Sequence, residues 1–528
     1  MVAMAVIPTS ETQRSLPPVL GRLLRGTFWL TLRTPLQAVL SFVTVRLMIE
    51  AIGKDANGAY VFAWGFGFLQ FLLEFGMASA LQRRVSEAWT TGDRQGLDRA
   101  VACGLSFYAT VAVIQSTFLI AIAYIAMPYL AWTGKSYELI VKLLWLQVFT
   151  SPCYGLAMVV SSVLQAARRY DVLPRLELFI VILRFLILVD GLWLGFDFFS
   201  VVVVQLWSGI LLSLGPGLWV MVKELGYIPK VGGVKLADFV QLWQIGFSMF
   251  LIQLSVVLAD KMDTTVLGVA LNDPGPANTT YSVVSKPFMQ IRQTGWMISS
   301  LVMPAAASLV AAKDSAAIER VMYDGSRMLI GLLLPVALLA GIYAGPFLSL
   351  WMGQEFAADR YLLQLFLIAA APLTLTILVQ IAIATGKLGF IACSSLAGAV
   401  VNLPLSYFLT TRLGVSGVIW GSVVTVLVAN LIVPGIYLFR ILNITPRAFL
   451  KRTLSAPATG ALALVIASTA CQSVLPALGS ESNFLMKAWP LFVNLMVGTL
   501  AYLVGYQIAP EGRGDFRQLA KKLIRHQA

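Results

Sequence analysis

Long runs of apolar residues, separated by short polar segments, follow one another along almost the whole chain of 528 residues. A helix needs about 20 residues to cross a hydrocarbon core of roughly 30 Å, because it rises about 1.5 Å per residue. By this length the pattern predicts an all-α polytopic membrane protein with about 14 transmembrane helices. We expect the first six at 26–48, 57–80, 100–127, 139–165, 176–194 and 200–222. The others are expected at 239–259, 279–311, 328–349, 361–384, 389–410, 415–439, 455–475 and 489–509.

The second set of six helices repeats features of the first. A shift of 221 residues keeps one register over a helix, a loop and the next helix, which duplication explains better than coincidence. It pairs Asn57 with Asn278, Tyr60 with Tyr281, Ser79 with Ser300, Asp93 with Asp314, Arg99 with Arg320 and Gly104 with Gly325. Because six helices return the chain to the same side of the membrane, we expect two lobes related by pseudo-twofold symmetry about the membrane normal.

This repeat divides the chain into six parts. We expect a cytoplasmic N-terminus (1–25), an N-terminal lobe (26–222), a cytoplasmic linker (223–238), a C-terminal lobe (239–439), two further helices (440–509) and a basic amphipathic tail (510–528). The tail is expected to lie on anionic lipid, with its apolar residues on one face and its cations towards the other.

Composition agrees with this picture, since 58% of the residues are hydrophobic and only 12% are charged. The formal net charge is +13. With both termini in the cytoplasm, most Lys and Arg fall in inner segments, so the positive-inside rule explains the charge without nucleic acid. No cleavable signal peptide is expected in the first 25 residues, because they lack an apolar core before a cleavage site.

Several kinds of chemistry are disfavoured by the residues that would have to carry them. The four cysteines lie singly in apolar runs, without the spacing of a zinc site or a disulfide framework. His526 is the only histidine and is the third residue from the end of the sequence. No GxxxxGK[ST] motif is present. We therefore expect no metal, no cofactor and no enzymatic activity.

Two predicted helices carry polar stripes. In 26–48, Arg33, Gln37, Ser41 and Thr44 share one face, and Arg46 lies nearer the outer end. In 279–311, Ser282, Lys286, Gln290 and Gln293 fall within about 80° of one another at 100° per residue, with Arg292 beside them. The other face of that helix holds Val284, Phe288, Ile291, Gly295 and Ile298.

A charge at the centre of a membrane helix costs roughly 2.5–3.5 kcal/mol, so each of these cations should face a partner, water or a ligand. One alternative is structural pairing of Arg33, Lys286 or Arg292 with Glu74, Asp260 or Asp263. Within helix 176–194, a local network of Glu177, Arg184 and Asp190 is equally open. Cations outnumber acids at depth, which favours a cationic cavity.

The order and spacing of several segments resemble a known family over nearly the whole chain. The segments are "EFGMASALQRRVSEAWTTGDRQGLDRAV", "LADKMDTTVLGVAL", "LSLWMGQEFAADRYLLQLFLIAA", "IATGKLGF" and "GVSGVIWGSVVTVLVANLI". They resemble the MOP exporter superfamily, in particular its polysaccharide branch of Wzx-like oligosaccharide flippases and, more distantly, MurJ-type lipid II flippases.

This resemblance implies movement of an undecaprenyl-pyrophosphate-linked oligosaccharide from the inner to the outer leaflet, through a cavity between two lobes. It also implies that cations on the first, second and eighth helices bind the pyrophosphate, which points to Arg33, Lys286 and Arg292. Helix 57–80 departs from that pattern because it carries Glu74 but no cation at depth. An O-antigen or exopolysaccharide unit is therefore a better expectation than lipid II.

The other candidates have supporting roles. Amide and aromatic groups suit sugar hydroxyls and C–H faces, so Gln37, Gln290, Gln293, Tyr281 and Trp296 are expected to contact the sugars, and Arg46 joins the substrate-binding set. Ion coupling would fall to Glu74, Arg184, Asp190 or Asp260. Expected partners are the lipid-linked oligosaccharide, membrane lipids, and a polysaccharide polymerase and glycosyltransferases. The expected location is the bacterial cytoplasmic membrane.

Three alternatives stay open. A MATE-like cation or drug antiporter would need a deep carboxylate in the N-terminal lobe, for which Glu74 is the candidate. A membrane glycosyltransferase or O-antigen ligase would need a long polar outer loop or clustered acids and histidines. A purely structural role would leave the two polar stripes without an explanation.

Overall fold

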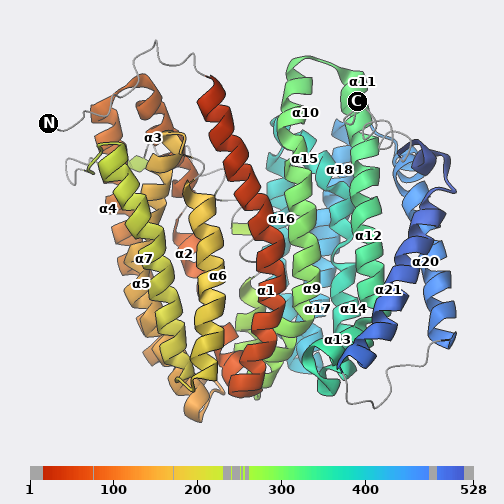
Figure 1. The fold of residues 1–528 in the computed structure, drawn as a ribbon, viewed down its shortest axis with the longest axis horizontal. Helices are drawn as coiled ribbons and strands as arrows, with labels where there is room; N and C mark the ends of the chain where they lie inside the picture. Colours follow the sequence, from red (N-terminus) through yellow and green to blue (C-terminus); the bar gives the residue numbers. More distant parts are fainter. Residues whose placement is uncertain are drawn as a thin grey trace. The chain divides into compact units, whose positions relative to one another are not determined.

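The computed structural model describes residues 16–74, 76–169, 172–229, 239–240, 250, 254–255, 258, 261–474 and 484–515. All regular elements in these ranges are helices. The chain forms two compact units, Met1–Thr279 (unit 1) and Thr280–Ala528 (unit 2). Within each unit, long helices lie side by side (Figure 1).

Eleven helices of the described residues are long and apolar enough to cross a membrane. This finding confirms the predicted all-α polytopic architecture. Two predicted helices are joined in the first span, Leu32–Gln70, and a third, 176–194, is not among the eleven because it carries several charged residues. The predicted helix at 239–259 lies mostly outside the described residues, as does the predicted amphipathic tail beyond Asp515.

Besides a helical segment at 261–270, the described residues of unit 1 form seven complete α-helices and the start of another. They are α1 (Leu16–Gly65), α2 (Phe68–Leu73), α3 (Met77–Thr91), α4 (Arg94–Ala121), α5 (Gly134–Ala166), α6 (Val172–Trp193), α7 (Phe198–Trp219) and the start of α9 (Pro274–Ser300). Phe62 and Trp132 pack at 5.0 Å in one core cluster. A second cluster surrounds Tyr108 and Leu81.

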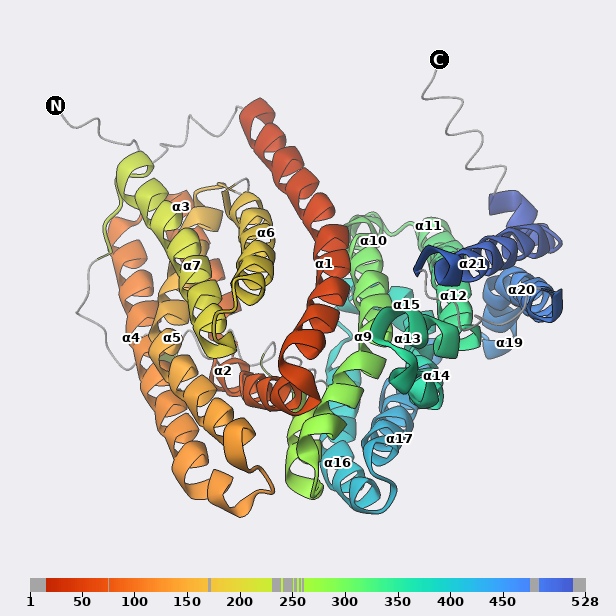
Figure 2. The same ribbon diagram turned by 60° about the horizontal axis from the view of Figure 1, so that its bottom comes forward.

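The break within α1 lies at Gly53, where the backbone adopts φ 78° and ψ 172°. Residues with a Cβ rarely adopt this conformation, so glycine is required at the turn between the first two predicted helices. The two parts of α1 run in different directions on either side of it (Figure 2).

After this break, α1 approaches the start of α9 closely. A Cβ on Gly58 would overlap the carbonyl group of Gly275. Asn57 Nδ2 donates a hydrogen bond to Thr279 Oγ1 at 3.1 Å, and Thr279 Oγ1 donates one to the Lys54 carbonyl at 2.6 Å. The repeat partner of Asn57, Asn278, is also buried at this junction and donates to the carbonyl of Pro274.

Unit 2 contains the rest of α9 and the helices that follow. These are α10 (Val302–Ala311), α11 (Ser315–Arg320), α12 (Ser326–Ile342), α13 (Ala344–Met352), α14 (Arg360–Ile368), α15 (Thr376–Ala384), α16 (Gly389–Leu413), α17 (Val415–Val426), α18 (Val433–Ile441), α19 (Pro446–Phe449), α20 (Ser455–Val474) and α21 (Phe484–Tyr506). Its main core lies around Leu378, Ile381 and Leu438, and α20 packs along α21.

The repeat is visible in the local structure of each unit. Asp93 is the N-cap of α4 and accepts a hydrogen bond from the Gly96 N–H at 2.9 Å. Asp314 is the N-cap of α11 and accepts one from the Ala317 N–H at the same distance. The residue before each aspartate has a positive φ, which is 73° at Gly92 in the first copy and 55° at Lys313 in the second.

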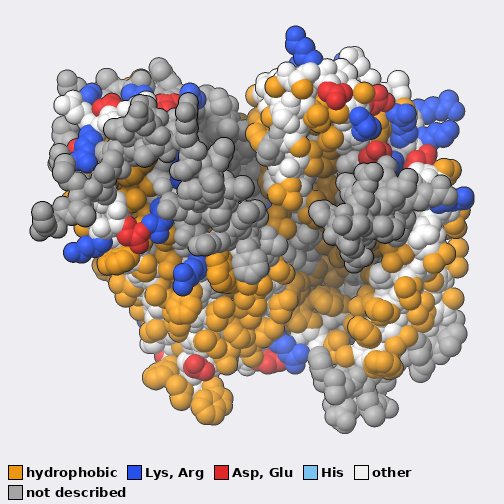
Figure 3. Space-filling view, turned by 45° about the horizontal axis from the view of Figure 1, so that its top comes forward, with side chains coloured by type: hydrophobic (Ala, Val, Ile, Leu, Met, Phe, Trp, Pro, Cys, Tyr) orange, Lys and Arg blue, Asp and Glu red, His pale blue; other side chains and the backbone are white. Residues whose placement is uncertain are grey.

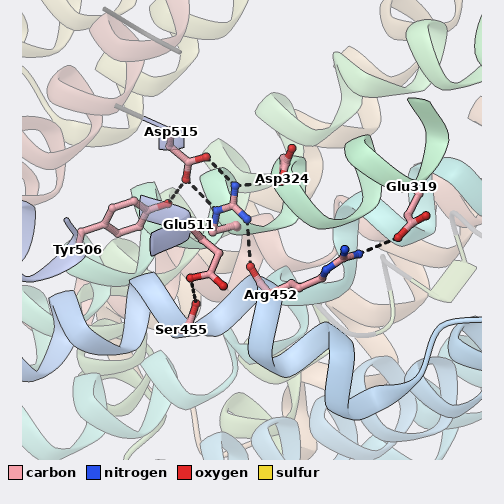
Figure 4. Close-up of polar contacts among 8 residues, drawn as sticks. Glu319, Asp324, Arg452, Ser455, Tyr506, Glu511 and Asp515 are labelled. Atoms are coloured by element: carbon pink, nitrogen blue, oxygen red, sulfur yellow. Dashed lines mark hydrogen bonds and ion pairs between the residues drawn. The ribbon is translucent and has the colours of Figure 1, made fainter. Parts of the chain in front are cut away.

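A buried ion pair joins the C-terminal helices to α12, and the sequence analysis did not find it (Figure 4). Arg327 of α12 donates to both carboxylate oxygens of Asp515, at 2.8 and 2.6 Å. Tyr506 donates to the same carboxylate at 2.8 Å, and Arg327 also donates to the Arg452 carbonyl at 3.1 Å. Arg327 and Asp515 are only 6% and 4% exposed.

Hydrophobic side chains cover the sides of many helices, whereas Lys, Arg, Asp and Glu gather mostly towards their ends (Figure 3). Exposed large apolar residues include Leu211 and Trp219 on α7, Leu462 on α20 and Trp489 on α21. A soluble protein rarely exposes so much apolar surface, but helices that face lipid do.

Candidate functional site

The predicted two-faced character of α9 is confirmed. Val284, Phe288 and Ile291 are buried in unit 2, and Gly295 lies close to Leu333 and Leu373. On the other face Lys286 and Gln290 are half-buried, Gln293 is exposed, and Trp296 is 52% exposed. The polar stripe therefore points away from the core of unit 2, where a ligand can reach it.

Arg292 stands at the border between these two faces. Its guanidinium lies 5.5 Å from the centre of the Phe288 ring and donates to Met289 Sδ at 3.1 Å. Phe288 stacks on Phe366 of α14 at 5.4 Å. The buried aromatic pair thus fixes the surface on which the cation rests.

Tyr281 does not share the accessible face. It is 3% exposed and packs edge-on against Phe366, with ring centres 5.4 Å apart. The sequence analysis expected it to contact sugars, but in this structure it is a core residue. Tyr281 directly precedes Ser282 of the stripe, about 100° away around the helix, and there it faces Phe366 of α14.

In unit 1, the cation of the α1 stripe already has a partner. Arg33 forms an ion pair and hydrogen bond with Glu177 of α6. Structural pairing of Arg33 was one of the alternatives left open by the sequence, with Glu74, Asp260 or Asp263 as the acids considered. The described partner is Glu177 instead, and Asp260 lies outside the described residues. The local network of Glu177 with Arg184 is not formed either.

Two other candidates on α1 are accessible. Gln37 is exposed, and Arg46 forms an i,i+4 ion pair with Glu50 at 2.8 Å, with both side chains largely exposed. A pair of this kind contributes little to stability. Asp190, near the end of α6, is exposed as well.

Unit 1 also contains a cavity of about 300 Å³ between its helices. The lining includes the amides of Gln70, Gln115 and Gln147, the ring of Trp64, and the guanidinium of Arg184. The sequence analysis named Arg184 as a candidate for ion coupling or for a local charge network, and not as a cavity residue. It missed Gln115 and Gln147, whose signal was a single amide within each of two apolar runs.

Glu74, the other acid predicted for ion coupling, is buried near this cavity. It is 2% exposed, and the hydroxyl of Tyr154, which lines the cavity, hydrogen-bonds its carboxyl group. Its Oε1 atom has no hydrogen-bond partner among the described residues. A buried carboxyl oxygen without a partner is costly, so this position has a reason to bind a proton or a cation.

Comparison with known proteins gives one family match and one sequence relative. A family model described as MatE matches residues 31–189. The chain is 25% identical over 260 residues to the "Uncharacterized membrane protein EpsK" of Bacillus subtilis (strain 168). The match covers 48% of this chain and 48% of that protein, so the chain spans about half the length of this curated relative.

Solved structures with the same fold cover more of the chain. The lipid II flippase MurJ, in an inward closed conformation, aligns with a TM-score of 0.72 at 12% identity, over 93% of this chain and 99% of that chain. Inward-facing and outward-facing MATE multidrug resistance transporters of the MOP superfamily align with TM-scores of 0.58 and 0.55 at 16% identity. They cover 77% and 80% of this chain, and 94% and 95% of their own.

Proposed function

We propose that this chain, whose family match and fold confirm its resemblance to the MOP exporter superfamily, is a flippase. Its substrate would be an undecaprenyl-pyrophosphate-linked oligosaccharide, an O-antigen or exopolysaccharide repeat unit. Transport from the inner to the outer leaflet would proceed by alternating access. We place the protein in the bacterial cytoplasmic membrane, with both termini in the cytoplasm and the enzymes of polysaccharide assembly as partners.

The observation that carries this proposal is how much of the chain each fold relative accounts for. The alignment with the MurJ structure covers 93% of this chain. The alignments with the two MATE structures cover only 77% and 80% of it, although they include 94% and 95% of the MATE chains. A larger part of this chain therefore has no aligned counterpart in the MATE structures than in the MurJ structure. This difference favours a lipid flippase over a drug antiporter.

The stripe on α9 supplies chemistry that fits an anionic, sugar-bearing head group. Lys286 and Arg292 offer positive charge for the pyrophosphate, since guanidinium and ammonium groups bind phosphate oxygens through charge-assisted hydrogen bonds. Gln290, Gln293 and the exposed Trp296 offer amides and an aromatic face for sugars. These roles are part of the proposal.

Arg33 of α1 is the third cation assigned to the pyrophosphate, and it pairs with Glu177. We infer that the anionic head group competes with Glu177 for the Arg33 guanidinium. The pair is partly exposed, with side chains 26% and 48% accessible. Its exchange for a phosphate is therefore not opposed by deep burial.

The membrane potential can drive such a cycle. Moving about two negative charges outward, from a cell interior that is negative, gains roughly 4–5 kcal/mol per 100 mV. A cation or proton coupled through Glu74 would add to this driving force. The unpartnered Oε1 atom of Glu74 is the observation that keeps a MATE-like cation antiporter as the second candidate function.

Flipping in proteoliposomes tests the proposal. The full-length protein is reconstituted with a fluorescent lipid-linked oligosaccharide, and the fraction accessible in each leaflet is measured with and without the protein. We expect accelerated redistribution, and a loss of at least about 10-fold in rate for the variant with Arg33, Lys286 and Arg292 all changed to Ala. The matched control is Arg412→Ala, because that arginine rests on Phe408 at 4.9 Å and lies outside both stripes.

The outcomes separate function from site. Equal leaflet distributions at equal rates, with and without the protein, would contradict the flippase function. An unchanged rate in the triple variant would contradict the proposed cations while leaving the flippase function in place. Export of a cationic drug in exchange for protons, without lipid movement, would establish the second candidate.

A further inference from the structure

The cavity of unit 1 is lined by a cation that forms no ion pair with any described carboxylate. Arg184 is the only charged residue in the cavity lining given by the described residues. It makes no hydrogen bond or ion pair through its guanidinium with any residue that the structure describes. Its electrostatic neighbour is the Tyr60 hydroxyl, which is uncharged at neutral pH.

This situation contrasts with other arginines of the chain. Arg33, Arg169 and Arg327 each pair with a carboxylate, namely Glu177, Glu224 and Asp515. Arg184 differs from these arginines because it has no carboxylate partner among the described residues, although it lines a cavity and is exposed there. Its guanidinium is therefore accessible to an anionic ligand that enters the cavity.

The fold makes room for this guanidinium. A Cβ atom on Gly209 of α7 would collide with the guanidinium nitrogens of Arg184. Gln205, one turn earlier on α7, donates its amide to the backbone carbonyl of Arg184 at 2.6 Å. The facing helix thus leaves space for the guanidinium where Gly209 lacks a side chain.

The rest of the lining offers both donors and acceptors. Ser151 donates to the amide oxygen of Gln115 at 2.8 Å, which leaves the two N–H groups of Gln115 for a ligand. Gln147 donates its amide nitrogen to the Ala63 carbonyl at 2.9 Å, which leaves its oxygen as an acceptor. Trp64 adds an aromatic surface to the same cavity.

We propose that this cavity is a second ligand site that binds an acidic sugar, with the carboxylate on Arg184 and the ring hydroxyls on Gln115 and Gln147. A guanidinium matches a carboxylate with two parallel hydrogen bonds, and amides match hydroxyls. The cavity lies at the small end of the roughly 300–1,000 Å³ range of small-molecule sites, which suits a short sugar segment and not a whole oligosaccharide.

The inference rests on the proposed function in one respect, because it takes the acidic sugar from the exported glycan. The site differs from the stripes of α1 and α9, whose cations are assigned to the pyrophosphate. It would make the protein select glycans that contain a uronic acid over neutral ones.

Calorimetric titration of the full-length protein in nanodiscs tests the site without any transport. The probes are glucuronate, glucose and inorganic phosphate. We expect saturable binding of glucuronate, with glucose at least about 10-fold weaker because a charged hydrogen bond is lost. Arg184→Gln should weaken glucuronate binding by a similar factor, and Arg412→Gln should leave it unchanged.

A second variant tests the same site in case Arg184→Gln does not fold. Gly209→Ala keeps every charge but displaces the guanidinium of Arg184, so it should weaken glucuronate binding. An unchanged elution volume in size-exclusion chromatography would show that this variant is still folded. If glucuronate does not bind to the unchanged protein, or binds to both variants as tightly as to the unchanged protein, the inference is overturned. Equal binding of phosphate, or displacement of glucuronate by phosphatidylglycerol, would also overturn it, by showing a general anion site or a lipid site.

A flipping assay then separates this inference from the proposed function. Two lipid-linked glycans, one with glucuronate and one with glucose in its place, are compared in proteoliposomes. A preference for the acidic glycan that Arg184→Gln removes supports the site. Equal flipping of both glycans would overturn the selectivity and leave the flippase intact, whereas flipping of neither would contradict the flippase itself.

Discussion

Asp93 and Asp314 cap matching helices, one in each unit. Each carboxylate accepts a hydrogen bond at 2.9 Å from the backbone N–H three residues later, and each follows a residue with positive φ. The two aspartates are related by the 221-residue shift found in the sequence. The duplication thus preserved a helix-capping turn as well as apolar helices.

Both caps should contribute to stability by a similar amount. Asp93→Ala or Asp314→Ala leaves a backbone N–H of the first turn without its acceptor, and we expect each to lower the free energy of unfolding by about 1 kcal/mol. Unfolding in mixed micelles measures it, with the exposed Asp190→Ala as control. A loss no greater than that of the control would show that water replaces the caps.

The ion pair of Arg327 and Asp515 should be a much larger contributor. Arg327→Met leaves a buried carboxylate without its cation, so we expect a loss of about 3–5 kcal/mol. Arg452→Met, which breaks an exposed pair with Glu319, should cost only about 0–1 kcal/mol.

The double variant Arg327→Met with Asp515→Leu separates pairing from burial. Because it removes both charges, it should recover most of the stability that Arg327→Met loses. Unfolding of the unchanged protein, Arg327→Met, Asp515→Leu and the double variant under one set of conditions completes the cycle. A double variant no more stable than the single one would mean that Asp515 is not the reason for the loss.

Gly53 should resist substitution although space is open around it. A Cβ there meets no atom within 4 Å, but φ is 78°. Gly53→Ala should therefore destabilise the protein by about 1–3 kcal/mol through backbone strain alone. Gly215→Ala is the control, because its Cβ also meets nothing and its φ is not positive. Equal stability of the two variants would show that the turn at Gly53 adjusts without cost.

The pair of Arg33 and Glu177 should regulate access to Arg33. If the head group competes with Glu177, then Glu177→Gln should lower the half-saturating concentration of lipid-linked oligosaccharide, and Arg33→Gln should raise it. Initial flipping rates over a range of substrate concentrations measure both. A purely structural pair predicts a different result, in which both variants lose stability and neither changes the half-saturating concentration.

Glu74 should carry any ion coupling. Glu74→Gln keeps the shape of the side chain but removes its charge, so flipping should lose its response to an imposed proton or sodium gradient and keep its response to membrane potential. Glu50→Gln, in an exposed pair with Arg46, is the control. An unchanged gradient response in Glu74→Gln would exclude Glu74 as the coupling site.

Much of the fold followed from the sequence because its signals are local. The length of an apolar run decides whether a helix can cross a bilayer, and the helical period decides which residues of α9 share a face. The structure confirms both, with Phe288 and Ile291 buried and Gln293 and Trp296 exposed. The pattern also separated the first two helices correctly, because the non-helical residue Gly53 lies between the predicted ranges 26–48 and 57–80.

The candidate site was predictable only in part, for a physical reason. Sequence by itself determined that cations and amides enter membrane helices and which direction each takes around its own helix axis. Only the tertiary structure decided that Arg33 meets Glu177, that Tyr281 is covered by Phe366, and that Arg184 lines a cavity of unit 1. A partner is chosen by how helices from distant parts of the chain pack, and no period within one helix contains that information.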